Sequence, residues 1–195
     1  MDGMMRAAPT ARRGAGVGLF LRRWARNPLQ MGSVVPSSPA LGRAIARHSR
    51  WDGGASVLEL GAGTGAVSRA LLAAGLPPER LVVVEIVPEM AAHLREALPG
   101  VRVVTGDAFA LPYILPAGLR LSTVICGIPL VLLPLERQRA FVDAVEVVAP
   151  GLGFLLYTYC ATSPLPYRKL GLGARREAFT PWNLPPASVW RYRPG

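Results

Sequence analysis

The chain has 195 residues and a mass of 20.8 kDa, and its 51% hydrophobic content is enough for one buried core and excludes a disordered protein. Two cysteines exclude a disulfide scaffold and a multi-cysteine zinc site, so no metal is expected, and no apolar run reaches the roughly 20 residues that cross a bilayer. The net charge of +10 combines two basic ends, +8 over residues 1–50 and +5 over 168–195, with a middle of −3, which indicates an anionic partner, either nucleic acid or an anionic lipid surface.

The first predicted element is a helix over residues 17–26. One face carries four apolar side chains and the other carries three arginines: Val17, Phe20, Leu21 and Trp24 against Arg22, Arg23 and Arg26. A basic helix with aromatic residues on its apolar face is typical of segments that lie on an anionic membrane. The alternative is an ordinary surface helix whose aromatic residues pack on the domain. A second helix is predicted to begin at the N-cap Ser38, with Pro39 as its first residue, and to end near His48.

From residue 56 onward, predicted strands and helices alternate. Strands are predicted over 56–60, 81–85, 101–105, 121–126 and 154–159, helices over 65–74, 88–98 and 134–149, and an antiparallel pair within 179–193. Such alternation indicates an α/β fold in which helices cover both faces of a mainly parallel sheet. We expect an N-terminal unit with membrane-binding and entry helices over residues 1–50 and the α/β core over 51–195.

The strongest motif is the glycine-rich segment 57–65, in which a buried strand runs into three alternate glycines and then a helix. Glycine at such a turn lets the backbone bend tightly and approach a ligand. The spacing is Gly-x-Gly-x-Gly, which fits a dinucleotide pyrophosphate poorly, and the acidic Glu59 just before the turn disfavours a phosphate. A plain strand-to-helix turn is the simpler reading of these glycines.

Two further acids follow the next two strands. Glu85 ends the second strand, 20 residues after Gly65, where a carboxylate can accept hydrogen bonds from both ribose hydroxyls. Asp107 follows the third strand, where it can accept from an adenine amino group. Each acid taken alone is better explained as a helix cap or a solvated charge. Together with the glycine turn, they resemble the class I S-adenosylmethionine-dependent methyltransferases.

This resemblance implies a Rossmann-like, mainly parallel seven-stranded sheet, with S-adenosylmethionine as cofactor and S-adenosylhomocysteine as product. The cofactor-binding residues that it implies are Glu59, Gly61, Ala62, Gly63, Thr64, Gly65, Glu85, Ile86, Gly106, Asp107, Ala108, Cys126 and Gly127.

The end of the fourth strand bears on the substrate. In amino-directed base methyltransferases this segment carries a polar residue that holds the amine and an aromatic residue that stacks on the flipped base. Here Gly127 has no polar side chain and Leu130 cannot stack. The segment therefore disfavours the rRNA or tRNA adenine N6-methylation that the basic charge would otherwise suggest, although that function stays open as an alternative.

The N-terminal segments 20–24, 27–28 and 32–38, together with 127–130, 157–159 and 185–190, resemble the bacterial phosphatidylethanolamine N-methyltransferases. The resemblance implies three methyl transfers from phosphatidylethanolamine to phosphatidylcholine, by a cytoplasmic monomer that binds the inner face of the membrane peripherally and no nucleic acid. The residues that it adds are Ser33 and Val35 for the cofactor, and Ser37, Ser38, Ile128 and Pro129 for the lipid. Candidates for the lipid phosphate are Arg22 and Arg168, with Arg23 and Lys169 as alternatives.

The reaction requires a neutral amine aimed at an already activated methyl group. His48 and His93 fall on predicted helices as surface residues, so no histidine base is evident. Tyr157 and Tyr159 are two residues apart on the fifth strand and share a face, and their rings would attract the cationic product; core packing is the alternative. Asn27 is a further polar candidate. A third reading of the chain is an inactive cofactor-binding domain that docks on membranes.

Overall fold

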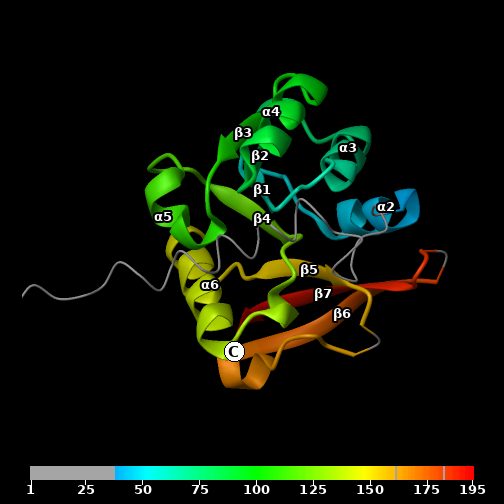
Figure 1. Cartoon of the computed structure of the whole chain (residues 1–195), viewed down its shortest axis with the longest axis vertical. Helices are drawn as coiled ribbons and strands as arrows, with labels where there is room; N and C mark the ends of the chain where they lie inside the picture. Colours follow the sequence, from blue (N-terminus) through cyan, green and yellow to red (C-terminus); the bar gives the residue numbers. More distant parts are fainter. Residues whose placement is uncertain (1–37, 161, 182) are drawn as a thin grey trace, which may run out of the picture.

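The computed structural model describes residues 38–160, 162–181 and 183–195 (Figure 1). The predicted helix 17–26, with Arg22, and the candidates Asn27, Ser33, Val35 and Ser37 lie outside this part of the chain. The described helices are α2 (Pro39–His48), α3 (Ala66–Ala73), α4 (Pro88–Ala97), α5 (Leu111–Ile114) and α6 (Leu135–Val148), with four 3₁₀ turns, η1 (Pro78–Arg80), η2 (Ala108–Ala110), η3 (Leu130–Leu132) and η4 (Tyr167–Leu170).

The strands are β1 (Ser56–Leu60), β2 (Leu81–Glu85), β3 (Arg102–Thr105), β4 (Leu121–Cys126), β5 (Phe154–Thr158), β6 (Leu172–Thr180) and β7 (Ala187–Pro194). They form one seven-stranded sheet of order β3-β2-β1-β4-β5-β7-β6. The first five strands are parallel, and β7 is antiparallel to both β5 and β6. This confirms the predicted Rossmann-like fold. The carboxyl ends of the parallel strands share one edge of the sheet, which we call the carboxyl edge.

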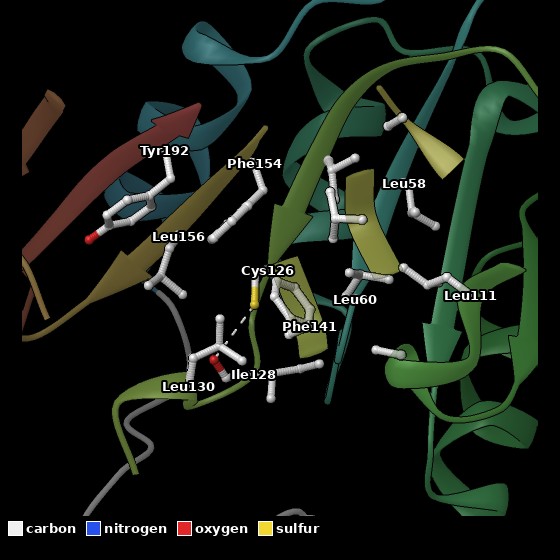
Figure 2. Packing of buried hydrophobic residues seen from close by; sticks show 14 of the residues in the cluster. Leu58, Leu60, Leu111, Cys126, Ile128, Leu130, Phe141, Phe154, Leu156 and Tyr192 are labelled. Carbon is white, nitrogen blue, oxygen red and sulfur yellow. Dashed lines mark hydrogen bonds between the residues drawn. The ribbon is translucent and has the colours of Figure 1, made fainter. Parts of the chain in front are cut away.

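Helices cover both faces of the sheet, as predicted (Figure 1). One core cluster joins Val57, Val83 and Ile125 to residues of α2, α3 and α4. The other joins the opposite side chains of the same strands to Phe141 of α6 and Leu111 of α5, and Figure 2 shows this packing around Cys126. Alternate side chains of a strand point to opposite faces, so continuous runs of apolar residues supply both clusters.

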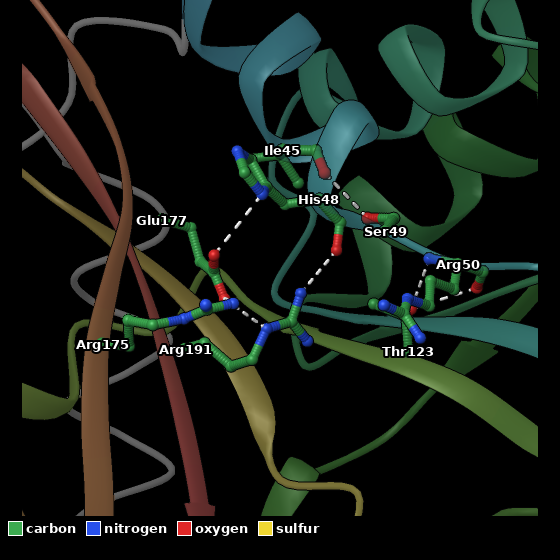
Figure 3. Close-up of polar contacts among 8 residues, drawn as sticks. All are labelled: Ile45, His48, Ser49, Arg50, Thr123, Arg175, Glu177 and Arg191. Carbon is green, nitrogen blue, oxygen red and sulfur yellow. Dashed lines mark hydrogen bonds and ion pairs between the residues drawn. The ribbon is translucent and has the colours of Figure 1, made fainter.

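The sheet differs from the sequence expectation at its outer strand. β6 begins at Leu172, whereas the antiparallel pair was expected to begin at Phe179. The reason is an ion-pair network that lets polar residues occupy this strand (Figure 3): Glu177 accepts hydrogen bonds from Arg175 at 2.9 Å and from Arg191 at 2.6 Å. Burial opposes ionisation of Glu177, but these hydrogen bonds outweigh it and hold its pKa below the usual range.

Hydrogen bonds stabilise both ends of helix α2. Ser38 caps its first turn, as predicted, by accepting from the Leu41 N–H at 3.2 Å. At the other end, the carbonyl oxygen of His48 accepts from Arg191 at 2.6 Å (Figure 3). Within the described residues, no helix is long and apolar enough to span a bilayer, and no group of three potential metal-ligating side chains occurs.

Candidate functional site

The glycine turn lies at the carboxyl edge, between β1 and α3. Gly61, Gly63 and Gly65 all have positive φ, at 72°, 56° and 77°. A Cβ on Gly65 would lie 2.8 Å from the end of the Leu94 side chain of α4, so a larger residue at that position would force this side chain to move and would be strained at its positive φ. The turn therefore presents bare backbone beside the ends of β1 and β2, which is what a closely approaching ligand requires.

Glu85 at the end of β2 braces this turn. One carboxylate oxygen accepts from the Gly63 N–H at 3.1 Å and the other accepts from the Val87 N–H at 3.0 Å, and the residue is only 2% exposed. Each carboxylate oxygen has two acceptor sites, so both oxygens retain one for a ligand hydroxyl. The sequence predicted the ribose contact of Glu85 but not its role in holding the turn.

Glu59, the acid that precedes the turn, is 1% exposed and only half satisfied. Its Oε2 accepts from the Ser68 hydroxyl at 2.6 Å, whereas its Oε1 is buried without a partner. Burial is the largest influence on Glu59 and raises its pKa to about 7. The Ser68 hydrogen bond and the charge of Arg69 act to lower the pKa, and the charge of Glu85 acts to raise it. A buried carboxyl group with an orphaned oxygen fits a ligand that brings a cation, such as the ammonium group of S-adenosylmethionine.

Asp107 follows β3 at the same edge. Its Oδ1 accepts from the Phe109 N–H at 3.0 Å, so the residue caps η2, which was one of its two predicted roles. The neighbouring Gly106 N–H donates to the Glu85 carbonyl oxygen at 3.0 Å. These bonds place Ile86, Gly106, Asp107 and Ala108 next to Glu85, as the cofactor assignment requires.

The end of β4 completes the edge. Cys126 is fully buried, and burial raises the pKa of its thiol to about 12, so its side chain belongs to the core and only its backbone faces the site. A Cβ on Gly127 would lie 2.5 Å from the Tyr157 hydroxyl and 2.6 Å from the Gly61 carbonyl oxygen. Gly127 thus lets the ends of β1 and β4 and the Tyr157 hydroxyl meet. Its neighbour Ile128 approaches Gly61 directly.

The two tyrosines lie where the sequence expectation put them. Tyr157 and Tyr159 both pack against the core cluster on the α2–α4 side of the sheet, so they share a face. Tyr157 reaches the glycine turn through its hydroxyl, as the Gly127 geometry shows. Burial raises the pKa of Tyr159, which therefore stays a neutral phenol at neutral pH.

The structure separates Arg168 from this group. Arg168 lies in η4, directly before β6, and the first residue of β6 pairs with Pro194 at the end of β7. Because β7 is antiparallel to β5, this is the edge of the sheet where β5 begins, opposite the carboxyl edge. His48 and His93 are also absent from the carboxyl edge, since His48 ends α2 beside Glu177 and His93 is an exposed residue of α4.

Asn183 also lies in this region, although no motif in the sequence indicates a role for it. Asn183 is 1% exposed; its Oδ1 accepts from the Ser38 N–H at 3.0 Å, and its Nδ2 donates to the Pro185 carbonyl oxygen at 2.7 Å. Asn183 therefore ties the start of α2 to the β6–β7 connection. This contact brings Ser38 to the carboxyl edge, although its hydroxyl is engaged in capping α2.

Comparisons with known proteins agree with this geometry. Residues 57–151 match the family described as methyltransferase domain. The chain is 33% identical over 181 residues to the ornithine lipid N-methyltransferase of Singulisphaera acidiphila, covering 88% of this chain and 93% of that protein. Among solved structures, the TehB-like SAM-dependent methyltransferase of Corynebacterium glutamicum has a TM-score of 0.56 at 14% identity, covering 93% and 99% of the two chains. The glycopeptide N-methyltransferase MtfA, solved with S-adenosylmethionine, has a TM-score of 0.52 at 20% identity, covering 83% and 68%.

Proposed function

Since the chain belongs to the class I S-adenosylmethionine-dependent methyltransferases, in the family of the ornithine lipid N-methyltransferase of Singulisphaera acidiphila, we propose that it methylates the amine of a membrane lipid headgroup. The observation that carries this proposal is the likeness to a lipid N-methyltransferase over nearly the whole of both chains. Phosphatidylethanolamine is the first candidate substrate, supported by the segment resemblances in the sequence. Ornithine lipid is the second, favoured by the substrate named for the relative.

The structure also supports a lipid over a nucleic acid base. Leu130, which stands where base methyltransferases carry a stacking aromatic residue, is 1% exposed and belongs to the core. Leu130 cannot stack on a flipped base. Ile128 cannot take over this role, because it is also buried, at 7% exposure. The carboxyl edge of β4 therefore offers an apolar boundary to the site and no platform for adenine.

S-adenosylmethionine is the cofactor of this family, and it supplies a methyl group already activated for transfer to a nucleophile. Glu85 would accept from its ribose hydroxyls, Glu59 would receive its ammonium group through the orphaned Oε1, and Asp107 would accept from its adenine amino group. The glycine turn gives these groups backbone clearance. These residues bind and orient, and none of them takes part in a covalent step.

The acceptor amine would lie between the end of β4 and the tyrosine pair. Tyr157 indicates this place, because its hydroxyl lies close to Gly127, where Gly127 packs against the Gly61 carbonyl oxygen. The neutral ring of Tyr159 suits a product that gains a fixed positive charge with full methylation, since aromatic faces attract cations. The proton of the incoming ammonium passes to water, either directly or through a tyrosine hydroxyl that releases its own proton to water as it accepts this one, and substitution of each hydroxyl distinguishes these routes.

We further propose that residues 17–26 bind an anionic membrane and so place the site at the cytoplasmic surface of the bilayer. The charge distribution supports this, since nine arginines and one acid lie in residues 1–50. Removal of residues 1–26 is expected to abolish sedimentation with anionic vesicles and to leave cofactor affinity largely unchanged. Equal sedimentation of the full-length and shortened proteins would contradict this part of the proposal.

The decisive experiment for the function follows transfer of the radiolabelled methyl group to three acceptors: vesicles with phosphatidylethanolamine, vesicles with ornithine lipid, and total RNA. Incorporation into either lipid supports lipid N-methylation, and the preferred lipid identifies the substrate. Mass spectrometry of the product then counts the methyl groups added. Incorporation into RNA alone would overturn the proposal, and cofactor binding without transfer to any acceptor would indicate an inactive docking domain.

A further inference from the structure

A cavity lies on the α6 side of the sheet, beside its outer strands β6 and β7. It has a volume of about 620 Å³ and opens between the 162–169 segment and strands β6 and β7. Its lining residues are Thr162, Ser163, Leu165, Pro166, Tyr167, Arg168, Lys169, Ala174 and Trp190. The adjoining turn η4 is held in place, because Arg139 of α6 donates a hydrogen bond to the Lys169 carbonyl oxygen.

The charged residues that line this cavity are all positive. Arg168 and Lys169 are exposed cations, and Lys169 is the only lysine of the chain. Among the described lining residues there is no carboxylate. A third cation, Arg176, lies 6.0 Å from the Trp190 ring on the neighbouring strand β6. The cavity therefore has the electrostatic character of an anion site.

A second, independent observation comes from Trp190. Its indole Nε1 is buried and has no hydrogen-bond partner, although Trp190 lines the cavity. A buried N–H without an acceptor is unfavourable, and indole can only donate. A shift of the Trp190 ring toward the cavity would let an oxyanion there supply the missing acceptor. The two cations would hold it, since charged hydrogen bonds are the strong ones.

We propose that this cavity binds a phosphate ester, held by Arg168 and Lys169 and by the indole N–H of Trp190. The volume has room for the organic group that the phosphate carries. The site is separate from the methyl-transfer site, because η4 lies at the edge of the sheet opposite the glycine turn and β7, which carries Trp190, lies two strands from β4. It gives Arg168, which the sequence assigned to the lipid phosphate, an anion partner at a different place. A free phosphate ester and the headgroup of an anionic phospholipid share this chemistry.

The indole N–H of Trp190 reports directly on such a ligand. The chain has four tryptophans, so Trp190→Phe identifies the Trp190 cross-peak in a ¹H–¹⁵N spectrum of the full chain. Glycerol 3-phosphate and monomeric dihexanoylphosphatidylglycerol are titrated separately at constant ionic strength. We expect a saturating downfield shift of the Trp190 indole proton with at least one probe. A response to the lipid probe alone would assign the site to a headgroup, and a response to both would assign it to phosphate esters in general.

The double variant Arg168→Ala/Lys169→Ala is expected to weaken this binding by about tenfold or more. Arg43→Ala/Arg47→Ala is the matched control, because it removes the same charge from exposed positions of α2 and should leave the titration unchanged. The dispersion of the amide spectrum shows whether each variant is folded. A bound phosphate ester should raise the Tm of the wild type, and Trp190→Phe should lose this rise. No shift of Trp190 with either probe, or equal shifts in both double variants, would overturn the proposal.

Discussion

The buried carboxyl group of Glu59 makes the stability of the cofactor-free protein depend on pH. Glu59 is 1% exposed, Ser68 is the partner of one of its oxygens and the other has none. Burial raises its pKa from 4.5 to about 7. Between these two values the folded protein holds a proton that the unfolded chain has released, so stability falls as pH rises through this range.

The expected size follows from the gap between the two pKa values. Each pH unit of difference is worth about 1.4 kcal/mol, so the gap from 4.5 to about 7 corresponds to about 3 kcal/mol. Glu59→Gln has the shape of the protonated acid and never ionises. We therefore expect the free energy of unfolding of this variant to gain about 2 to 3 kcal/mol relative to wild type between pH 5 and pH 8.

Urea unfolding of both proteins at a series of pH values measures this difference, and comparison of the two proteins cancels the titration of other groups. The ligand arm uses S-adenosylhomocysteine, whose ammonium group would stabilise the ionised carboxylate. Calorimetry in buffers of different ionisation enthalpy should show proton release on binding to wild type at pH 6 and none for Glu59→Gln. Parallel stability curves for the two proteins would refute the pKa argument, and equal proton release would refute the ammonium contact.

Substitutions at four further positions test the site. Glu85→Gln keeps one acceptor oxygen and so strands one of the two backbone N–H groups that Glu85 holds, whereas Glu85→Ala strands both, at about 1–3 kcal/mol in urea unfolding for each. Both variants should weaken S-adenosylhomocysteine binding about tenfold or more by calorimetry, and unchanged affinity of both would exclude the ribose contact. At Tyr157 and Tyr159, a mild loss of kcat in the Phe variants with a severe loss in the Ala variants would indicate that the rings contact the amine. A loss of about 10²-fold in a Phe variant would indicate that the hydroxyl takes part. Wild-type rates in both Ala variants would show that the two tyrosines are core residues. Gly127→Ala should destabilise the protein by about 1–3 kcal/mol and weaken cofactor binding, because its methyl group would lie 2.6 Å from the Gly61 carbonyl oxygen; a variant with wild-type stability and affinity would show that the turn can shift.

The central strands were predictable because each is a short apolar run flanked by turn residues. β1, β2 and β4 begin and end where the sequence indicated, since strands buried on both faces carry hydrophobic side chains without alternation. β6 was not predictable from 172 onward, because Arg175 and Glu177 look like loop residues until Arg191 is known to lie beside them. A polar strand of this kind is stabilised by a partner strand that is distant in sequence.

The site was predictable wherever topology alone determines position. A parallel sheet brings the ends of all its strands to one edge, so Glu85 and Asp107 could be placed beside the glycine turn from the sequence. The position of Arg168 could not be predicted, because it depends on the reversed direction of β7 and on where β6 begins. The half-satisfied state of Glu59 was also hidden, since it depends on which side chains surround the carboxyl group.

Asn183 carries the last prediction, because it joins two parts of the chain that are 145 residues apart. It accepts from the Ser38 N–H and donates to the Pro185 carbonyl oxygen while only 1% exposed. Asn183→Ala leaves both groups without a partner, which should lower the free energy of unfolding by about 1–3 kcal/mol for each. Asn183→Asp keeps the acceptor for Ser38 but buries a carboxylate oxygen against the Pro185 carbonyl oxygen, so it should hold the start of α2 at a larger cost in stability than Asn183→Ala. The residues predicted to approach the cofactor from the N-terminal side directly precede Ser38, so Asn183→Ala should also weaken S-adenosylhomocysteine binding more than Asn183→Asp does. Equal cofactor affinity in both variants and in wild type would show that the start of α2 does not position that segment.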